Sequence, residues 1–153
     1  KRGAMPAKRI ADLEFKLRLG SGVLMPTIAV LELCDWNLSK LRRPDNLALV
    51  ARAARQATEV VMPGRARLRI RLLTTRFILS LIIFFAPRVT PFNLPNLLRV
   101  HFSKVRRQTI AMLDNYADAA RNRGIGIDAI ESIRLSLRNR CSEESPGESP
   151  STC

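Results

Sequence analysis

Apolar residues recur along most of the chain at three- and four-residue spacing, which is typical of helices that bury one face. Ile10, Leu13 and Leu17 share such a face. Gly20 and Gly22 follow them, and glycine is unfavourable inside a helix. The pattern therefore predicts a first short helix that ends at these glycines.

Prolines mark the next two predicted helices. Pro26 suits a first helical turn, where no backbone N–H is needed, and the apolar spacing continues from there to Leu41. Pro44 followed by Asp45 has the same character, and the "PG" at 63–64 is a stop signal. We expect one helix from Pro26 to Leu41 and another from Pro44 to about 62.

Residues 77–86 are apolar except for Ser80. A membrane-spanning helix needs about 20 predominantly apolar residues, and extending this run backwards brings in Arg69, Arg71 and Arg76. A single-pass span is therefore disfavoured, and burial in protein is the better interpretation. We predict a helix over 74–86, followed by a proline-rich connector in which Asn93 or a neighbour caps the next helix.

Arginine occupies every second position in the segment just before this helix. As a strand, the segment would project all of these side chains from one face; as a helix, it would place them in pairs on two opposing sides. Both alternatives remain open for residues 65–73. The arginines concerned are Arg65, Arg67, Arg69 and Arg71.

A long helix is predicted from about Pro95, because one apolar stripe runs from Leu98 to Ala120. Gly124 is placed to end it in the left-handed conformation. Asp128 and Glu131 have the spacing of a capping box for a last helix.

The fold class that follows is all-α, an irregular bundle of about five to six helices, with a possible short strand at 65–73. We expect one helical domain over residues 1–141. Residues 142–153 are rich in Ser and Pro and carry acidic side chains, which predicts a flexible acidic C-terminal tail.

Charge changes this picture more than any motif. The 153 residues contain 26 Lys and Arg against 13 Asp and Glu, a formal net charge of +13, which favours polyanionic partners. Most of the cations are arginines, whose planar guanidinium can grip phosphate with two parallel hydrogen bonds. Codon bias in a GC-rich genome would also favour arginine, so the charge itself is the stronger signal.

The cations gather in three regions of the sequence, which suits a protein wedged among several RNA strands or subunits. No acidic residue lies within four positions of the group near residue 104. The candidate RNA-binding residues are Lys8 and Arg9; Arg65, Arg67, Arg69, Arg71 and Arg76; and Arg99, Lys104, Arg106 and Arg107.

No pattern in the sequence indicates catalysis. Cys34, Cys141 and Cys153 match no zinc or iron–sulfur spacing, and His101 has no carboxylate or cysteine partner nearby in sequence. No nucleophile–base set and no pair of carboxylates stands out. We therefore expect no enzyme, cofactor, metal or small-molecule substrate.

The expected function is that of a non-catalytic structural subunit of a large ribonucleoprotein, a mitochondrial ribosome above all, bound to rRNA and to neighbouring protein subunits. A sequence that starts without Met is compatible with a removed presequence and hence with the mitochondrial matrix. Two alternatives stay open. One is an accessory subunit of an inner-membrane respiratory or ATP-synthase complex, the only alternative with membrane contact, and the other is a helical nucleic-acid-binding regulator.

Overall fold

A computed structural model of the chain describes residues 13–61, 72, 74–91, 93–104 and 106–144. Within these ranges the regular structure is helical and no strand occurs, so the all-α prediction is confirmed. The strand alternative at 65–73 falls outside the described residues apart from Leu72. The helices are α1 (Leu13–Leu33), α2 (Leu38–Leu41), α3 (Pro44–Val61), α5 (Arg76–Val89), α6 (Leu94–Lys104), α7 (Arg106–Arg121) and α8 (Asp128–Glu144).

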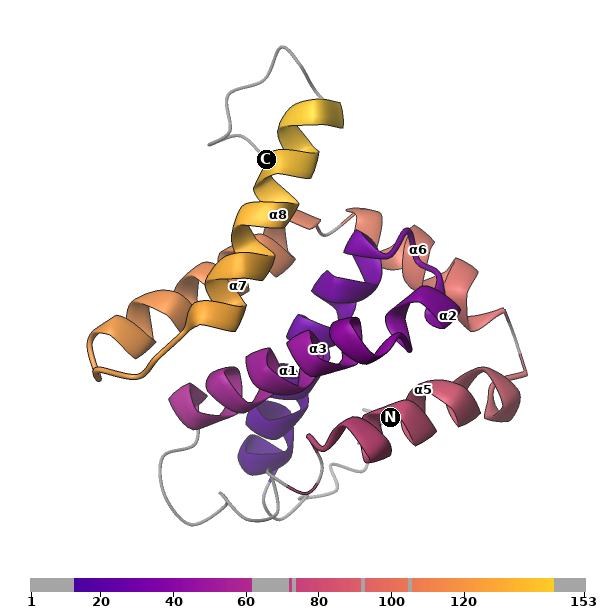
Figure 1. Ribbon diagram of the computed structural model, residues 1–153, viewed down its shortest axis with the longest axis horizontal. Helices are drawn as coiled ribbons and strands as arrows, with labels where there is room; N and C mark the ends of the chain where they lie inside the picture. Colours follow the sequence, from indigo (N-terminus) through magenta and orange to yellow (C-terminus); the bar gives the residue numbers. More distant parts are fainter. Residues whose placement is uncertain (1–12, 62–71, 73, 92, 105, 145–153) are drawn as a thin grey trace, which may run out of the picture.

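The pair formed by α1 and α3 is the centre of the fold (Figure 1). On one side α7 and α8 pack against each other and against this pair, and on the other side α5 lies along α3. α6 joins α5 to α7. The core between these helices is aliphatic, and its largest fully buried apolar side chains are Ile28, Leu31, Val30, Leu41, Val50, Leu113, Ile130, Ile133 and Leu137.

The first helix differs from the prediction, because α1 continues through Gly20, Gly22 and Pro26. Gly22 does not end the helix but allows α1 to pack closely against α3. A Cβ at this position would lie 2.8 Å from Cγ2 of Thr58 on α3. Pro26 is buried inside the helix, and the following residue, Thr27, donates its hydroxyl to the carbonyl of Val23 at 2.7 Å. Tertiary packing has overridden local propensity here.

The predicted single helix from Pro26 to Leu41 is also wrong. The chain turns after Leu33, and a separate short helix follows. Asp35 and Trp36 both adopt positive φ, 56° and 59°, and the Trp36 N–H donates to the Leu31 carbonyl at 2.9 Å. α2 then starts afresh, with the Asn37 side chain accepting from the backbone N–H groups of the first turn. Residues 33–38 contain no glycine or proline that would have indicated this turn in the sequence.

The helix boundaries around α5 follow the prediction more closely. Thr75 caps α5, whose last turn contains Pro87 and extends to Val89, three residues beyond the predicted end. Asn93 accepts from the Asn96 N–H at 3.2 Å and caps α6, as predicted. The long predicted helix is described as two, α6 and α7, with Val105 between them outside the described residues.

Both ends of the α7–α8 connection can be compared with the prediction. Gly124 has φ 65°, and the Ile125 N–H donates to the Ala120 carbonyl at 3.0 Å, so the left-handed cap is confirmed. The capping box is wrong. The side chain of Gln56, from α3, accepts from the Ile130 N–H and donates to Asp128. α8 runs to Glu144, so residues 142–144 of the expected tail are helical, and residues 145–153 lie outside the described residues.

Replacing Gly22 with Ala should destabilise the protein, because the new methyl group would collide with Thr58 and force α1 and α3 apart. We expect a loss of about 1–3 kcal/mol in the free energy of unfolding, measured by chemical denaturation. Gly20→Ala is the matched control, since a Cβ at position 20 would have nothing within 4 Å and alanine favours the helix. A Gly22→Ala variant as stable as Gly20→Ala would contradict the close α1–α3 contact.

Candidate interaction surface

α5 is apolar on two opposite sides. Leu79 and Ile83 point inward and are buried, and they lie on the side of the helix that faces α3. The opposite side carries Phe77, Leu81, Phe85 and Val89, which follow one another every four residues and are 72%, 40%, 51% and 80% exposed. We call these four residues the outer ridge. Within the described structure, burial of the 77–86 run is therefore confined to its inner side.

Exposed apolar side chains continue beyond the outer ridge. Ile82 is exposed on α5, and Leu97 and Val100 are exposed on α6. In the described part of the chain no single helix has the length and apolar character of a membrane span. α5 and α6 meet that test only as a pair, which is bent by 102°. Monomeric proteins rarely leave such extended apolar surface in water, so this region is the first candidate for a contact with another molecule.

Two arginines meet at one aromatic ring beside the outer ridge. The guanidinium carbon of Arg88 lies 3.7 Å from the centroid of Phe84, and that of Arg42 lies 4.7 Å from it. Arg88 also donates to the Phe84 carbonyl at 2.6 Å. The four-residue spacing of Phe84 and Arg88 could have revealed one of these contacts in the sequence. The approach of Arg42, from the turn between α2 and α3, could not be foreseen.

The eleven candidate RNA-binding residues divide into three groups. Four are exposed on the described surface, and one is taken up by an interior ion pair. Six lie outside the described residues. The exposed residues are Arg76 on α5, Arg99 and Lys104 on α6, and Arg107 on α7; the ion-paired one is Arg106; the remaining six are Lys8, Arg9, Arg65, Arg67, Arg69 and Arg71.

Arg106 is turned toward the interior of the protein. Its Nε pairs with Oε1 of Glu32 on α1, whose side chain is only 1% exposed. Arg140 of α8 donates to the backbone carbonyl of the same Glu32 at 2.6 Å. The sequence showed no acidic residue within four positions of Arg106, but the partner comes from 74 positions away. Its position favours a structural role for Arg106.

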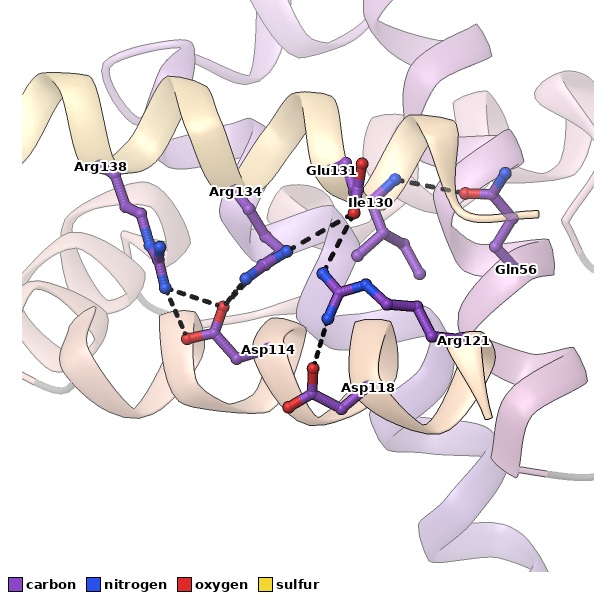
Figure 2. A network of polar contacts seen from close by, with 8 residues as sticks. All are labelled: Gln56, Asp114, Asp118, Arg121, Ile130, Glu131, Arg134 and Arg138. Atoms are coloured by element: carbon purple, nitrogen blue, oxygen red, sulfur yellow. Dashed lines mark hydrogen bonds and ion pairs between the residues drawn. The ribbon is translucent and has the colours of Figure 1, made fainter. Parts of the chain in front are cut away.

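A second group of arginines holds α7 against α8 (Figure 2). Arg134 and Arg138 both donate to the carboxylate of Asp114, at 2.6 Å from Nε of Arg134 and 3.0 Å from Nη2 of Arg138. Arg121 reaches Asp118 on its own helix and Glu131 on α8. These arginines therefore serve the fold, and the net charge overstates the number of cations available to a partner.

The turn after α1 is held by another charged group. Asp35 accepts from Nζ of Lys40 at 2.8 Å and from Arg140. These hydrogen bonds, to Lys40 first and then Arg140, lower the pKa of Asp35 from 3.8 to about 2. The carboxylate thus stays ionised and keeps the end of α8 close to the turn.

The described cysteines lie inside the protein. Cys34 and Cys141 are buried thiols, and burial raises the pKa of the Cys34 thiol, which disfavours the reactive thiolate. Among the described residues no three His, Cys, Asp or Glu side chains gather as metal ligands would. The exposed surface of α5 and α6, with the cations beside it, is therefore the candidate functional site.

Arg106→Ala should destabilise the protein by about 3–5 kcal/mol, because it removes the guanidinium that pairs with the buried Glu32 carboxylate. Arg107→Ala, at the exposed neighbouring position, should change the free energy of unfolding by at most about 0.5 kcal/mol. Replacing both Glu32 and Arg106 with leucine should recover much of the loss, since no unpaired charge remains. Equal stabilities of the two alanine variants would contradict the interior ion pair.

The Asp35 carboxyl should titrate in the folded protein with a midpoint near pH 2, measured by NMR. Because its folded pKa is lower than its ordinary value, the stabilising contribution of this group is present above about pH 4 and disappears as the pH falls through 2. Lys40→Met should raise the midpoint toward 3.8. A midpoint already near 3.8 in the unsubstituted protein would mean that the contacts with Lys40 and Arg140 do not form in solution.

No family model, no curated protein and no solved structure matches this chain. The inference of function therefore depends on the exposed side chains of α5, α6 and α7 and on the charge pattern of the sequence.

Proposed function

We propose that this chain is a non-catalytic structural subunit of a large ribonucleoprotein. One observation carries the proposal: residues 60–113 contain ten Lys and Arg and not a single Asp or Glu. The described part of this segment displays apolar ridge residues and exposed cations together. A ribonucleoprotein offers a partner for each of them, protein neighbours for the first and phosphates for the second.

The cations that remain for phosphate are those the fold does not use. Arg76, Lys104 and Arg107 are exposed, and the structure gives them no acidic partner among the residues it describes. Arg65, Arg67, Arg69 and Arg71 belong to the same acid-free segment of the sequence. Neutralising phosphates with such side chains releases counterions, which makes the association strong at low salt. A ribosome, the mitochondrial one in particular, is the assembly that we propose.

The bent α5–α6 pair favours a second candidate, an accessory subunit of a mitochondrial inner-membrane complex. The pair meets the length and composition of a membrane span only when its two helices are taken together. In this case the apolar surface would lie against membrane subunits and the arginines would meet anionic headgroups.

Sedimentation in a sucrose gradient separates these candidates. A tagged chain, recovered from cells of its own source at low salt, should sediment with an RNA-containing particle and move to the top of the gradient after RNase treatment or in high salt. Sedimentation that survives RNase and follows detergent-solubilised membranes would support the membrane candidate and overturn the ribonucleoprotein.

Single substitutions locate the RNA contact. Arg107→Glu should weaken the binding of the purified chain to structured RNA and reduce the slope of log affinity against log salt by about 1. Arg55→Glu on α3 is the matched control, because it makes the same change in charge at an exposed position outside the acid-free segment. Equal losses from both variants would show that only net charge matters, and would contradict a phosphate contact at Arg107.

A further inference from the structure

α5 presents two parallel rows of side chains that differ in chemistry. The outer ridge is one row, and the row next to it begins and ends with a cation. Each row repeats every four residues, the spacing of the ridges by which helices pack on one another. The second row consists of Arg76, Ser80, Phe84 and Arg88, and we call it the basic row.

The guanidinium groups beside the ridge are held in place. The guanidinium groups of Arg42 and Arg88 both lie over the ring of Phe84, and Arg88 also donates a hydrogen bond to the Phe84 carbonyl. Stacking of this kind uses the face of the guanidinium and leaves N–H groups at its edge, where a carboxylate can accept two hydrogen bonds. Arg42 comes from the turn after α2, so two separate parts of the fold converge on this ring.

No carboxylate of the segment that contains Arg88 competes for its guanidinium group. Residues 60–113 contain no Asp or Glu, and the structure pairs neither Arg42 nor Arg88 with an acidic residue among those it describes. Both side chains are exposed. Two positioned guanidinium groups therefore lie beside an exposed apolar ridge without a negative partner in the described part of the chain.

We propose that the outer ridge, together with Arg42 and Arg88, is the docking surface for an amphipathic helix of another protein, whose apolar stripe covers the ridge and whose flanking carboxylates pair with the two arginines. This inference rests on the proposed function and deepens it, because it specifies the chemistry of one protein neighbour in the assembly.

The shape of the surface favours a helix as the occupant. From Phe77 to Val89 the ridge extends about 18 Å, or three to four turns, and a partner helix of ordinary length can cover it. Ridges at four-residue spacing pack into the grooves of a second helix. Burying four side chains that are 40–80% exposed supplies the hydrophobic term, and the arginines select for acidic flanks.

Charge and rigidity disfavour the other occupants. A second copy of this chain would bring like charges together at Arg42 and Arg88, which costs free energy at an interface. A membrane surface attracts cations by its diffuse potential and has no need for guanidinium groups that are fixed in orientation. A carboxylate on a helix does profit from that orientation.

The test uses the full chain and two fluorescent helical peptides of about 18 residues. Both carry the same leucine stripe; one has glutamates and the other lysines along its flanks. Fluorescence anisotropy should show that the acidic peptide binds at least about tenfold more tightly at low salt, and that salt reduces this preference. Arg42→Glu combined with Arg88→Glu should reverse the preference.

Control variants separate the docking surface from general charge and from folding. Arg55→Glu should leave the peptide preference unchanged, since Arg55 lies on α3 and points to the Ala51 carbonyl. Phe77→Ser with Phe85→Ser should abolish binding of both peptides. The two phenylalanines are exposed, so circular dichroism and the unfolding midpoint should show that the fold remains intact.

Three outcomes would overturn the docking proposal. The first is equal affinity for the two peptides. The second is binding to vesicles of phosphatidylcholine and phosphatidylglycerol without binding of the acidic peptide. The third is a dimer in analytical ultracentrifugation that the two phenylalanine substitutions dissociate. Cosedimentation with an RNA-containing particle tests the proposed function separately, so a chain that enters the particle but shows no peptide preference refutes only the docking helix.

Discussion

The close contact between α1 and α3 is the constraint on which the rest of the structure depends. Gly22 permits it, because any larger side chain would meet Thr58, and the alanine-rich face of α3 extends it. α7 and α8 pack on both helices and α5 packs on α3, so the geometry of the pair fixes where they lie. The exposed ridge of α5 owes its position to the same contact, since the inner side of α5 rests on α3.

Ion pairs between helices determine how many of the cations remain available to a partner. Arg106, Arg134 and Arg138 neutralise carboxylates that belong to other helices. Arg106 of α7 pairs with Glu32 of α1, and Arg134 and Arg138 of α8 pair with Asp114 of the preceding helix, α7. An arginine used in this way is not available to a polyanion. The charge of +13 is therefore a weaker guide to the partner class than the positions of the exposed cations, of which Arg76, Arg88, Lys104 and Arg107 lie on α5, α6 and the start of α7.

The sequence predicts well those features that depend on neighbouring residues. The cap at Gly124, the cap of α6 at Asn93 and the start of α3 at Pro44 all follow from local spacing. It fails where a distant helix supplies the decisive contact. Thr58 explains the continuation of α1 through Gly22, and Gln56 replaces the capping box of α8.

The candidate site shows the same division. Local composition identified the 77–86 run as apolar and placed Arg76, Lys104 and Arg107 among the candidate cations, and these three are exposed. Which side of α5 faces α3 could not be predicted, because both sides are apolar. The role of Arg106 was missed for another reason. Its partner, Glu32, is brought to it by the packing of α1 against α7, which local sequence does not encode.

A helix that is apolar on all sides is normally found inside a protein, and α5 comes close to that composition while only its inner side is covered by the described part of this chain. The outer ridge contributes little to the stability of the isolated fold, since much of its surface stays in contact with water. The favourable free energy of burying these apolar side chains is gained only when a partner covers the ridge. Any molecule that binds the ridge binds the folded state alone, so by mass action it stabilises the whole bundle through α3. The fold of this chain and its assembly are thus linked through α5, with Leu79 and Ile83 on one side and the outer ridge on the other.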